Sequence, residues 1–450
     1  MIYTPSSFEA EMLAQRMVAE QGARLKAYKR AREYYQGNQK QPLEVKVGQA
    51  NDNVIVNMNR LIIDKGAAFL FGKDVVFELQ EGDTTPEEEY LDALWKRNQK
   101  MTFLLKAGTS GGIYGHVFVK IMPEVYQGIY PRLVNIEPEY VTVIWDGADI
   151  ETVYEYRIQW TAINRKGQGV TRRQRIMLDD SGVTWSIINE VNAGNKWEAD
   201  SENEDVTWPY AWPPMIDCQN MPAAGQYYGW ADMEEQSEQD AINYVASKIQ
   251  RILRFHAHPK TVASGMKNQD LSANEDEVLF LPGVGMSLRN MEMQSDLGSA
   301  LQFLDRLIVF CMKQGRVPNL DPASMNIGAL SGFALQVLYG DLLEKTEAKR
   351  RTYGDMLVEL NRRLLDMNGM GDDNYSTIHW SDPLPENEQE RKERDAFEMD
   401  YKLASRETVQ TRRGLDSEVE AERVAAQEVR EGNIGAALLR NFSLSGETEA

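Results

Sequence analysis

The chain has 450 residues, of which 42% are hydrophobic, 26% charged and 9% aromatic, and its formal net charge at pH 7 is −20. These values are typical of a folded globular protein of roughly three domains, and they exclude a wholly disordered chain and a small disulfide-stapled scaffold. The negative charge argues against a protein that grips nucleic acid through clustered Lys and Arg, and the two cysteines, Cys218 and Cys311, cannot form a disulfide framework or a multi-cysteine metal site.

The N-terminal quarter is predicted to be mainly helical. Its first residues, MIYTPSSFEAEM, lack the basic region and apolar core of a secretion signal, and no run of about 18 apolar residues occurs in the chain. We therefore expect neither secretion nor a membrane span. Helices are predicted over residues 1–36 and 61–71, followed by a strand at 75–79, and a helix that opens at Pro86 is predicted to run to about residue 107.

The next part of the chain has the composition of a β-sheet. Segments rich in Val, Ile, Tyr and Trp, separated by Gly, Asn and Asp, occupy residues 113–188 and predict a mostly antiparallel sheet. Residues 192–229 contain a polar stretch followed by WPYAWPP, and this composition indicates a linker that packs locally.

Two helices follow, over residues 230–255 and from about 296 to 315, and each has an apolar stripe along one face. The first has acids at its start and bases at its end, the order that the helix dipole favours. Between them, EVLFLPGVGMSLRNMEM predicts a hairpin or short strands around the turn Pro282–Gly285. We expect an antiparallel pair that carries this β excursion at its far end. The apolar stripes include Ile242, Val245, Ile249, Leu301, Leu304 and Ile308.

A loop at residues 317–331 then joins these helices to a long helix, predicted over residues 332–367. The loop contains no Lys or Arg and a single acid. Within the long helix YGDLL recurs as YGDML, so Tyr339 and Tyr353 are expected on nearly the same face. Residues 385–431 are highly charged and predicted to be helical, and the end of the chain is expected to fray.

Two features could belong to an enzyme. GTSGG at residues 108–112 matches the GxSxG pattern with Ser110 as nucleophile and His116 nearby, but a helix before the serine and a strand after it reverse the order that a nucleophile elbow needs. His256 and His258 would point the same way on a strand, yet no third His or Cys stands at ligand spacing. No phosphate-cradling GxxxxGK[ST] occurs, so no motor activity is expected. A hydrolase using Ser110 or a His256/His258 metal site is the alternative function.

Several motifs resemble those of one family. They are YYQG, NMNR and IIDKGAAFLFGK near the N-terminus, GIYGHVFVKI, NIGALSGFALQ before the long helix, and the C-terminal series PLPENEQE, LASRETV and LDSEVEAERVAAQEVRE. In this combination the chain resembles, over nearly all of its length, the portal proteins of tailed double-stranded DNA bacteriophages of the long-tailed type. The resemblance implies an α+β portal fold with a mixed α/β wing, a helical stalk, a small β-containing clip, and a long helix leading to a helical crown.

The resemblance also assigns domains and sites. The domains it implies are a wing at residues 1–229, a first stem helix at 230–255, a clip at 256–295, a second stem helix at 296–316, a tunnel loop at 317–331, a long helix with a return to the wing at 332–384, and a crown with a flexible tail at 385–450. The tunnel-loop residues that it implies along the DNA channel are Asn319, Asp321, Ser324, Met325, Asn326, Ile327, Leu330 and Ser331. The clip residues that it implies for terminase or adaptor contact are Asn268, Asp270, Glu275, Asp276, Glu277, Pro282 and Gly283.

The function implied is a closed dodecameric ring at one capsid vertex, through which double-stranded DNA is packaged and ejected. The expected partners are further copies of the chain, the major capsid and scaffolding proteins, the large terminase subunit and, later, head-completion adaptor and tail proteins. Assembly is expected in the bacterial host cytoplasm, and the mature location in the virion. No cofactor, metal or catalytic residue is implied. A loop that lines a channel around moving DNA should not bind phosphate, which fits a loop without Lys or Arg.

Overall fold

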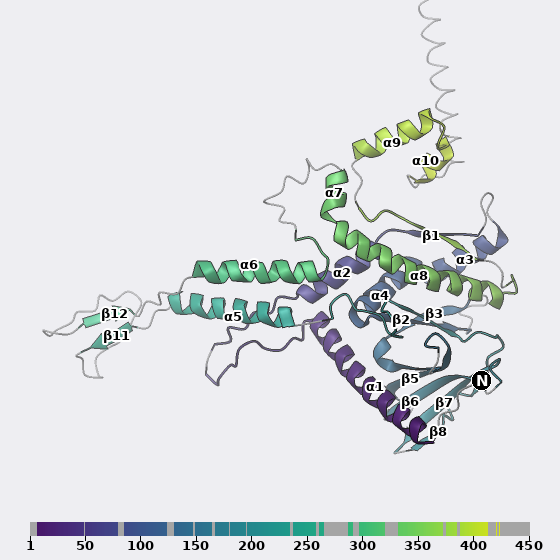
Figure 1. The fold of residues 1–450 in the computed structure, drawn as a ribbon, viewed down its shortest axis with the longest axis horizontal. Coiled ribbons are helices and arrows are strands. Elements are labelled where there is room, and N and C mark those ends of the chain that lie inside the picture. The colour runs from purple at the N-terminus through teal and green to yellow at the C-terminus, as the bar shows by residue number, and fades with distance from the viewer. Residues whose placement is uncertain are drawn as a thin grey trace, which may run out of the picture. The chain divides into compact units, whose positions relative to one another are not determined.

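The computed structural model (Figure 1) describes residues 7–48, 50–79, 85–123, 130–146, 149–163, 167–179, 181–194, 196–234, 237–257, 261–264, 287–290, 297–319, 332–371, 375–384 and 388–412, with residues 420 and 423. The chain divides into two compact units, one of residues 1–326 and 336–383 and the other of residues 327–335 and 384–450. No helix among the described residues combines the length and the apolar character that a membrane span requires.

Five helices form the helical layer of the larger unit. They are α1 (Ser7–Gln36), α2 (Met58–Phe71), α3 (Pro86–Arg97), α4 (Lys100–Tyr114) and α8 (Gly340–Met367). The start of α3 carries a capping box, in which the Thr85 hydroxyl accepts from the backbone N–H of Glu88 and the Glu88 carboxylate accepts from that of Thr85. α4 packs across α2, and α8 packs against both α2 and α3. These contacts bury the apolar faces that the sequence pattern predicts.

The single helix predicted over residues 86–107 is wrong, because the structure has two. Gln99 takes a left-handed conformation (φ 54°) between α3 and α4. The side chain of Asn98 fixes this corner, since its amide donates to the carbonyl oxygens of Leu94 and Pro131 and its oxygen accepts from the backbone N–H of Leu133. α4 then continues to Tyr114, so the following strand begins at His116 and not at the predicted residue 113.

The strands form antiparallel sheets, as predicted. A three-stranded sheet has the order β10 (Met215–Gln219), β2 (His116–Met122), β3 (Arg132–Ile136). A larger sheet follows a short 3-10 helix, η1 (Pro138–Tyr140), and contains β4 (Val141–Trp145), β5 (Val153–Ile163), β6 (Gly169–Leu178), β7 (Trp185–Ala193) and β8 (Lys196–Ala199), with β9 (Val206–Thr207) paired to β7. The prediction of residues 192–229 as a linker is therefore wrong in part: β10 pairs with the central strand β2, where Met215 is fully buried.

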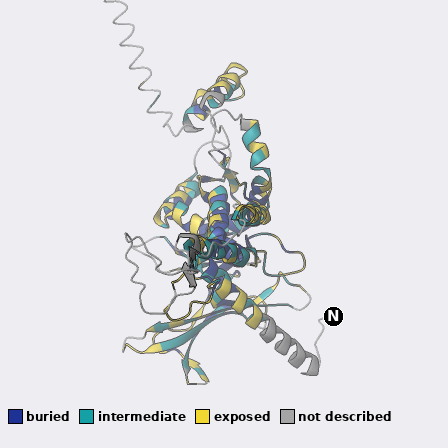
Figure 2. Cartoon of the chain, turned by 90° about the vertical axis from the view of Figure 1, so that its left-hand side faces the viewer, coloured by how far each residue is buried: buried dark blue, intermediate teal, exposed yellow. Residues whose placement is uncertain are grey.

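The main core lies between the helices and these sheets (Figure 2). Trp95 of α3, Phe118 of β2 and Tyr353 of α8 are among its largest fully buried side chains. The indole N–H of Trp95 donates to the side-chain oxygen of Asn361 at 2.8 Å, so this buried N–H group has a hydrogen-bond acceptor. A further strand, β13 (Thr377–Trp380), returns to pair with β1 (Val75–Glu78).

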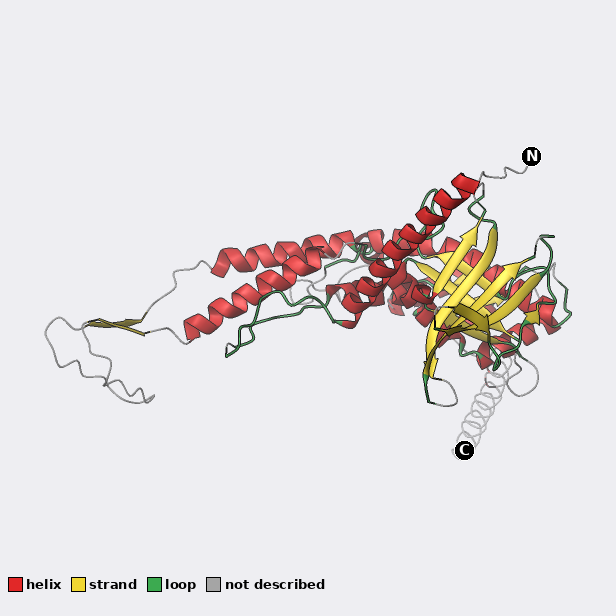
Figure 3. Ribbon diagram, turned by 90° about the horizontal axis from the view of Figure 1, so that it is seen from below, coloured by secondary structure: helices red, strands yellow, loops and turns green. Residues whose placement is uncertain are grey.

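The two striped helices are α5 (Ser237–Ala257) and α6 (Leu297–Gln314), and they pack side by side (Figure 3). The predicted start of the first helix at residue 230 is wrong, since α5 begins at Ser237. A short antiparallel pair, β11 (Thr261–Ser264) and β12 (Ser287–Asn290), follows α5 and precedes α6 along the chain. The hairpin predicted around Pro282–Gly285 lies outside the described residues.

The long helix predicted over residues 332–367 is also two helices. α7 (Gly332–Leu338) ends before Tyr339, and α8 begins at Gly340, a residue of low helix propensity. Tyr339 stacks on Phe69 with ring centroids 5.3 Å apart, and Tyr353 contacts Phe71 edge-on at 5.5 Å, so both tyrosines pack on α2. In the smaller unit, the charged C-terminal stretch contains α9 (Glu388–Asp400) and α10 (Arg406–Arg412).

Candidate functional site

The first feature of the helix pair is a polar ladder along α5. Its rungs are Gln239, Asn243 and Ser247, each completely buried. Their side-chain oxygens accept, at 2.9 Å in each case, from the backbone N–H groups of Met58, Val56 and Val54 respectively. An extended segment before α2 is thereby held along the helix.

The spacing of this ladder follows from backbone geometry. Four helical residues rise about 6.0 Å, while two extended residues rise about 6.6 Å, so every fourth side chain of a helix can meet every second N–H of a neighbouring extended segment. At the outer end of the ladder Asp52, which is 3% exposed, binds Arg254 through both carboxylate oxygens at 2.7 Å and Arg251 at 3.2 Å. The sequence carries this signal in the spacing of four on α5, but the apolar stripe alone does not predict it.

The apolar stripe of α5 and α6 packs against the rest of the unit through a second hydrophobic cluster. Ile242 is fully buried there beside Ile62 of α2 and Leu342 of α8, and Leu304 and Ile308 are partly buried against it. Ile249 is also buried and Val245 is half-buried. The cluster joins four helices at the base of the pair.

Part of α6 is not covered in this way by the residues that the structure describes. Leu301, predicted as part of the packed stripe, is 49% exposed, and Phe303 and Phe310 are 52% and 59% exposed. The two phenylalanines are seven residues apart, so they lie on one face of the helix, two turns from each other. Large exposed apolar side chains grouped on one element indicate a contact surface.

A buried ionic cluster lies where α2, α4 and α8 meet. Asp232, which precedes α5, is held by Lys349 at 2.7 Å and by Lys345 at 3.3 Å, and all three side chains are at most 2% exposed. The side-chain amide of Asn220 also donates to Asp232 at 3.1 Å. Burial raises the pKa of Asp232, but the two lysines and Asn220 outweigh burial and hold it below its ordinary value.

This cluster explains the glycines of GTSGG. A Cβ at Gly112 would lie 3.0 Å from the Asp232 carboxylate, and one at Gly66 of α2 would lie 2.5 Å from it. A Cβ at Gly111 would lie only 1.9 Å from the Tyr353 hydroxyl. The glycines allow close approach in a packed core. Ser110 lies inside α4 and is buried, so the elbow geometry of the alternative hydrolase is not present.

His116, the expected neighbour of Ser110, pairs with Asp217 instead. The Nε2 atom of His116 lies 2.7 Å from Asp217, which also accepts from the hydroxyls of Tyr156 at 2.8 Å and Tyr227 at 2.5 Å. Burial raises the pKa of Asp217, and these hydrogen bonds lower it further than burial raises it. Because both phenol groups donate to the carboxylate, the cluster ties together β2, β5, β10 and the segment before α5.

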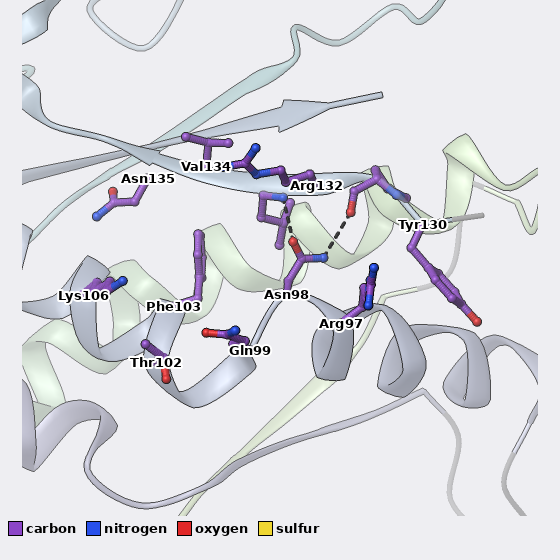
Figure 4. Close-up of a pocket in the computed structure, with 12 residues that line it drawn as sticks. Arg97, Asn98, Gln99, Thr102, Phe103, Lys106, Tyr130, Arg132, Val134 and Asn135 are labelled. Atoms are coloured by element: carbon purple, nitrogen blue, oxygen red, sulfur yellow. Dashed lines mark hydrogen bonds between the residues drawn. The ribbon is translucent and has the colours of Figure 1, made fainter. Parts of the chain in front are cut away.

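A surface pocket of about 600 Å³ lies between the α3–α4 corner and β3 (Figure 4). Arg97, Lys106 and Arg132 line it, together with Thr102 and Asn135. The lining includes no carboxylate, histidine or cysteine side chain. His256 lies at the end of α5 and His258 outside the described residues, and within the described part of the chain no three His, Cys, Asp or Glu side chains are grouped to hold a metal ion.

A family model described as "Phage portal protein, SPP1 Gp6-like" matches residues 15–431. The chain belongs to this family of phage portal proteins. The resemblance predicted from the motifs is confirmed, and with it the α+β fold class that the helices and antiparallel sheets show. A portal protein is a structural component of the phage head–tail connector.

Other comparisons add little to the family match. The solved structure described as "Neck of native GTA particle computed with C12 symmetry" is similar over 79% of this chain and 88% of that chain, at 15% sequence identity and a TM-score of 0.40. A comparison with curated proteins gives no match.

Most of the predicted portal sites lie outside the described residues. This holds for all seven clip residues and for every tunnel-loop residue except Asn319, which is exposed just after α6. The division into wing, stem, clip, tunnel loop and crown stays a prediction. The described residues bring together the base of the helix pair, the start of the predicted tunnel loop, and the ionic cluster.

Proposed function

We propose that the chain assembles into a closed ring at one capsid vertex and that double-stranded DNA enters and leaves the capsid through the channel of this ring. The observation that carries the proposal is the family match over residues 15–431. The exposed face of α6 supports it, because one chain by itself leaves Phe303 and Phe310 in contact with water. Burying a Phe side chain against a second copy contributes about 1.5–3 kcal/mol, and a ring repeats the contact at every interface.

The charge of the chain suits the passage of DNA. A chain with net charge −20 gives a ring that repels the phosphate backbone overall, and residues 317–331, the proposed channel loop, contain no Lys or Arg. DNA in such a channel stays mobile because few counterions would be released by contact. The driving force must come from another protein, since the sequence contains no phosphate-cradling loop of the GxxxxGK[ST] type.

Different partners are expected to bind at successive stages of assembly and packaging. We infer that the clip, residues 256–295, docks the large terminase subunit during packaging and head-completion adaptor or tail proteins afterwards. Capsid and scaffolding proteins would surround the ring while it assembles in the host cytoplasm. About twelve copies are expected from the resemblance to other portal proteins.

The ring is tested by electron microscopy of the purified protein. The wild-type chain should give rings, and the double variant Phe303→Glu, Phe310→Glu should remain monomeric, because burying carboxylates at an interface is costly. The control Gln302→Glu, Lys313→Glu places two carboxylates at exposed positions that lie about 80–100° around α6 from Phe303, and it should still form rings. A wild-type protein that is monomeric at every concentration would overturn the proposal, and rings in the Phe variant would remove this face from the interface.

The channel loop is tested by packaging. Ser324→Lys or Asn326→Lys should create phosphate contacts and slow DNA packaging without preventing ring formation, whereas Ser324→Ala should leave the rate unchanged. Packaging at the wild-type rate in both lysine variants would show that the loop does not line the channel.

A further inference from the structure

The end of α6, where the proposed channel loop begins, has an unusual cap. The backbone N–H of Val317 donates to Met312 at 2.9 Å and that of Arg316 donates to Lys313 at 3.0 Å, which is the Schellman pattern. The left-handed position of this motif usually holds glycine, but here it is Arg316, with φ 57°. Because a side chain at this φ is disfavoured, the cap needs additional contacts to stay closed.

Two contacts supply this support. Val317 and Met312 both lie in the hydrophobic cluster with Ile62 and Leu342. The carbonyl oxygen of Gly315, which the Schellman bonds leave without a donor, accepts from the ammonium of Lys345 in α8 at 3.0 Å. The closed cap therefore depends on a lysine from a distant helix.

That lysine belongs to a cluster with more positive than negative charge. The charged groups that face Lys345 are Lys349 one turn along α8, Asp232 from the segment before α5, and Arg316 past the end of α6. α2 and α4 place Gly66 and Gly112 beside the carboxylate. Lys345 and Lys349 are both buried, with a single buried carboxylate between them. One ammonium charge is thus left without a counterion in a site that excludes water.

We propose that this surplus charge makes the junction of α6 and α8 a pH-sensitive joint. The cap of Gly315, Arg316 and Val317, where the 317–331 segment begins, opens more readily while Lys345 is protonated and is more stably closed when Lys345 is neutral. The neutral amine still has N–H groups to donate to Gly315, so loss of the proton removes the charge penalty and keeps the hydrogen bond. The consequence for DNA passage rests on the proposed role of the 317–331 segment, whereas the joint itself does not.

The direction of the pH effect follows from the protons bound in each state. Burial lowers the pKa of Lys345 from 10.5 to about 8, although Asp232 acts in the opposite direction. When the joint opens, water restores the ordinary value. Between these two pKa values the open state holds more protons than the closed state, so raising the pH favours the closed state. The open population should fall by about tenfold from pH 7 to pH 9.

Hydrogen exchange of the full-length protein tests this joint. After correction for the intrinsic rate, protection of the Gly315, Arg316 and Val317 amides should rise about tenfold from pH 7 to pH 9, while the ladder amides of Val54 and Val56 show no such rise. Lys345→Met and Lys345→Gln should abolish the rise whatever their basal protection. The control Lys313→Met, at an exposed lysine in the last turn of α6, should keep it.

A flat wild-type profile would overturn the proposal without any variant. A rise that persists in Lys345→Met or Lys345→Gln would assign the titration to another group and overturn it as well. Either result leaves the packaging test of Ser324→Lys unaffected, so failure of the joint and failure of the channel loop are distinguishable.

Discussion

The polar ladder on α5 leads to a prediction that apolar packing alone would not give. Asn243 makes three hydrogen bonds: its oxygen accepts from the Val56 N–H at 2.9 Å and from the Gln239 amide at 3.0 Å, and its own amide donates to Gln39 at 2.6 Å. Asn243→Leu keeps a side chain of similar size and removes all three. The change therefore tests hydrogen bonding without opening a large cavity.

The magnitude follows from the groups left behind. The Gln239 amide keeps the Val56 carbonyl as an acceptor, but the Val56 N–H and the side-chain oxygen of Gln39 lose their partners. Each unsatisfied buried group costs about 1–3 kcal/mol, and the added apolar burial of Leu returns about 1 kcal/mol. The net cost is about 3 kcal/mol, which corresponds to a local opening roughly 100-fold more populated.

Hydrogen exchange over residues 52–58 measures this opening directly. Exchange at Val54, Val56 and Met58 should accelerate in Asn243→Leu, whereas Gln250→Leu, at an exposed position of the same helix, should leave it unchanged. Unchanged exchange at Val56 in Asn243→Leu would refute the ladder as the force that holds this segment. Acceleration spread evenly over the larger unit would equally contradict a local role.

Two further predictions concern the core and the sheet. Gly111→Ala should destabilise the protein by about 1–3 kcal/mol, because the new Cβ would meet the Tyr353 hydroxyl, while Gly354→Ala, with no neighbour nearer than 4.0 Å, should stabilise it by about 1 kcal/mol; urea unfolding that gives both variants the same sign would be inconsistent with this packing. Burial raises the pKa of Glu155, but hydrogen bonds from Arg175 and Arg157 hold it below 4.5 in the folded protein. The ionised Glu155 carboxylate therefore stabilises the fold above pH 4.5, and this stabilisation is lost as the pH falls through the lowered pKa of the folded state. The urea midpoint of Glu155→Gln should therefore fall less between pH 5 and pH 3 than that of the wild-type protein, and equal falls would contradict the ion-pair assignment.

The family and several of its elements could be predicted from the sequence. The portal motifs occur along nearly the whole chain, and the family match covers residues 15–431. The paired helices α5 and α6 and the antiparallel strands between residues 116 and 193 follow from the period of their apolar residues. Such periodicity is a local property, since it requires only that one face of each element be buried.

The tertiary structure decided where these patterns are interrupted. The corner between α3 and α4 depends on Asn98 reaching Pro131 and Leu133, and the late start of α5 accompanies the burial of Asp232 between two lysines of α8. The GTSGG sequence likewise matches the pattern of a nucleophile elbow, whereas in the folded structure its glycines allow a tight helix crossing. These features rest on partners between 33 and 242 residues apart, as in the pairs Asn98–Pro131 and Gly111–Tyr353, and local propensity contains no information about such distant partners.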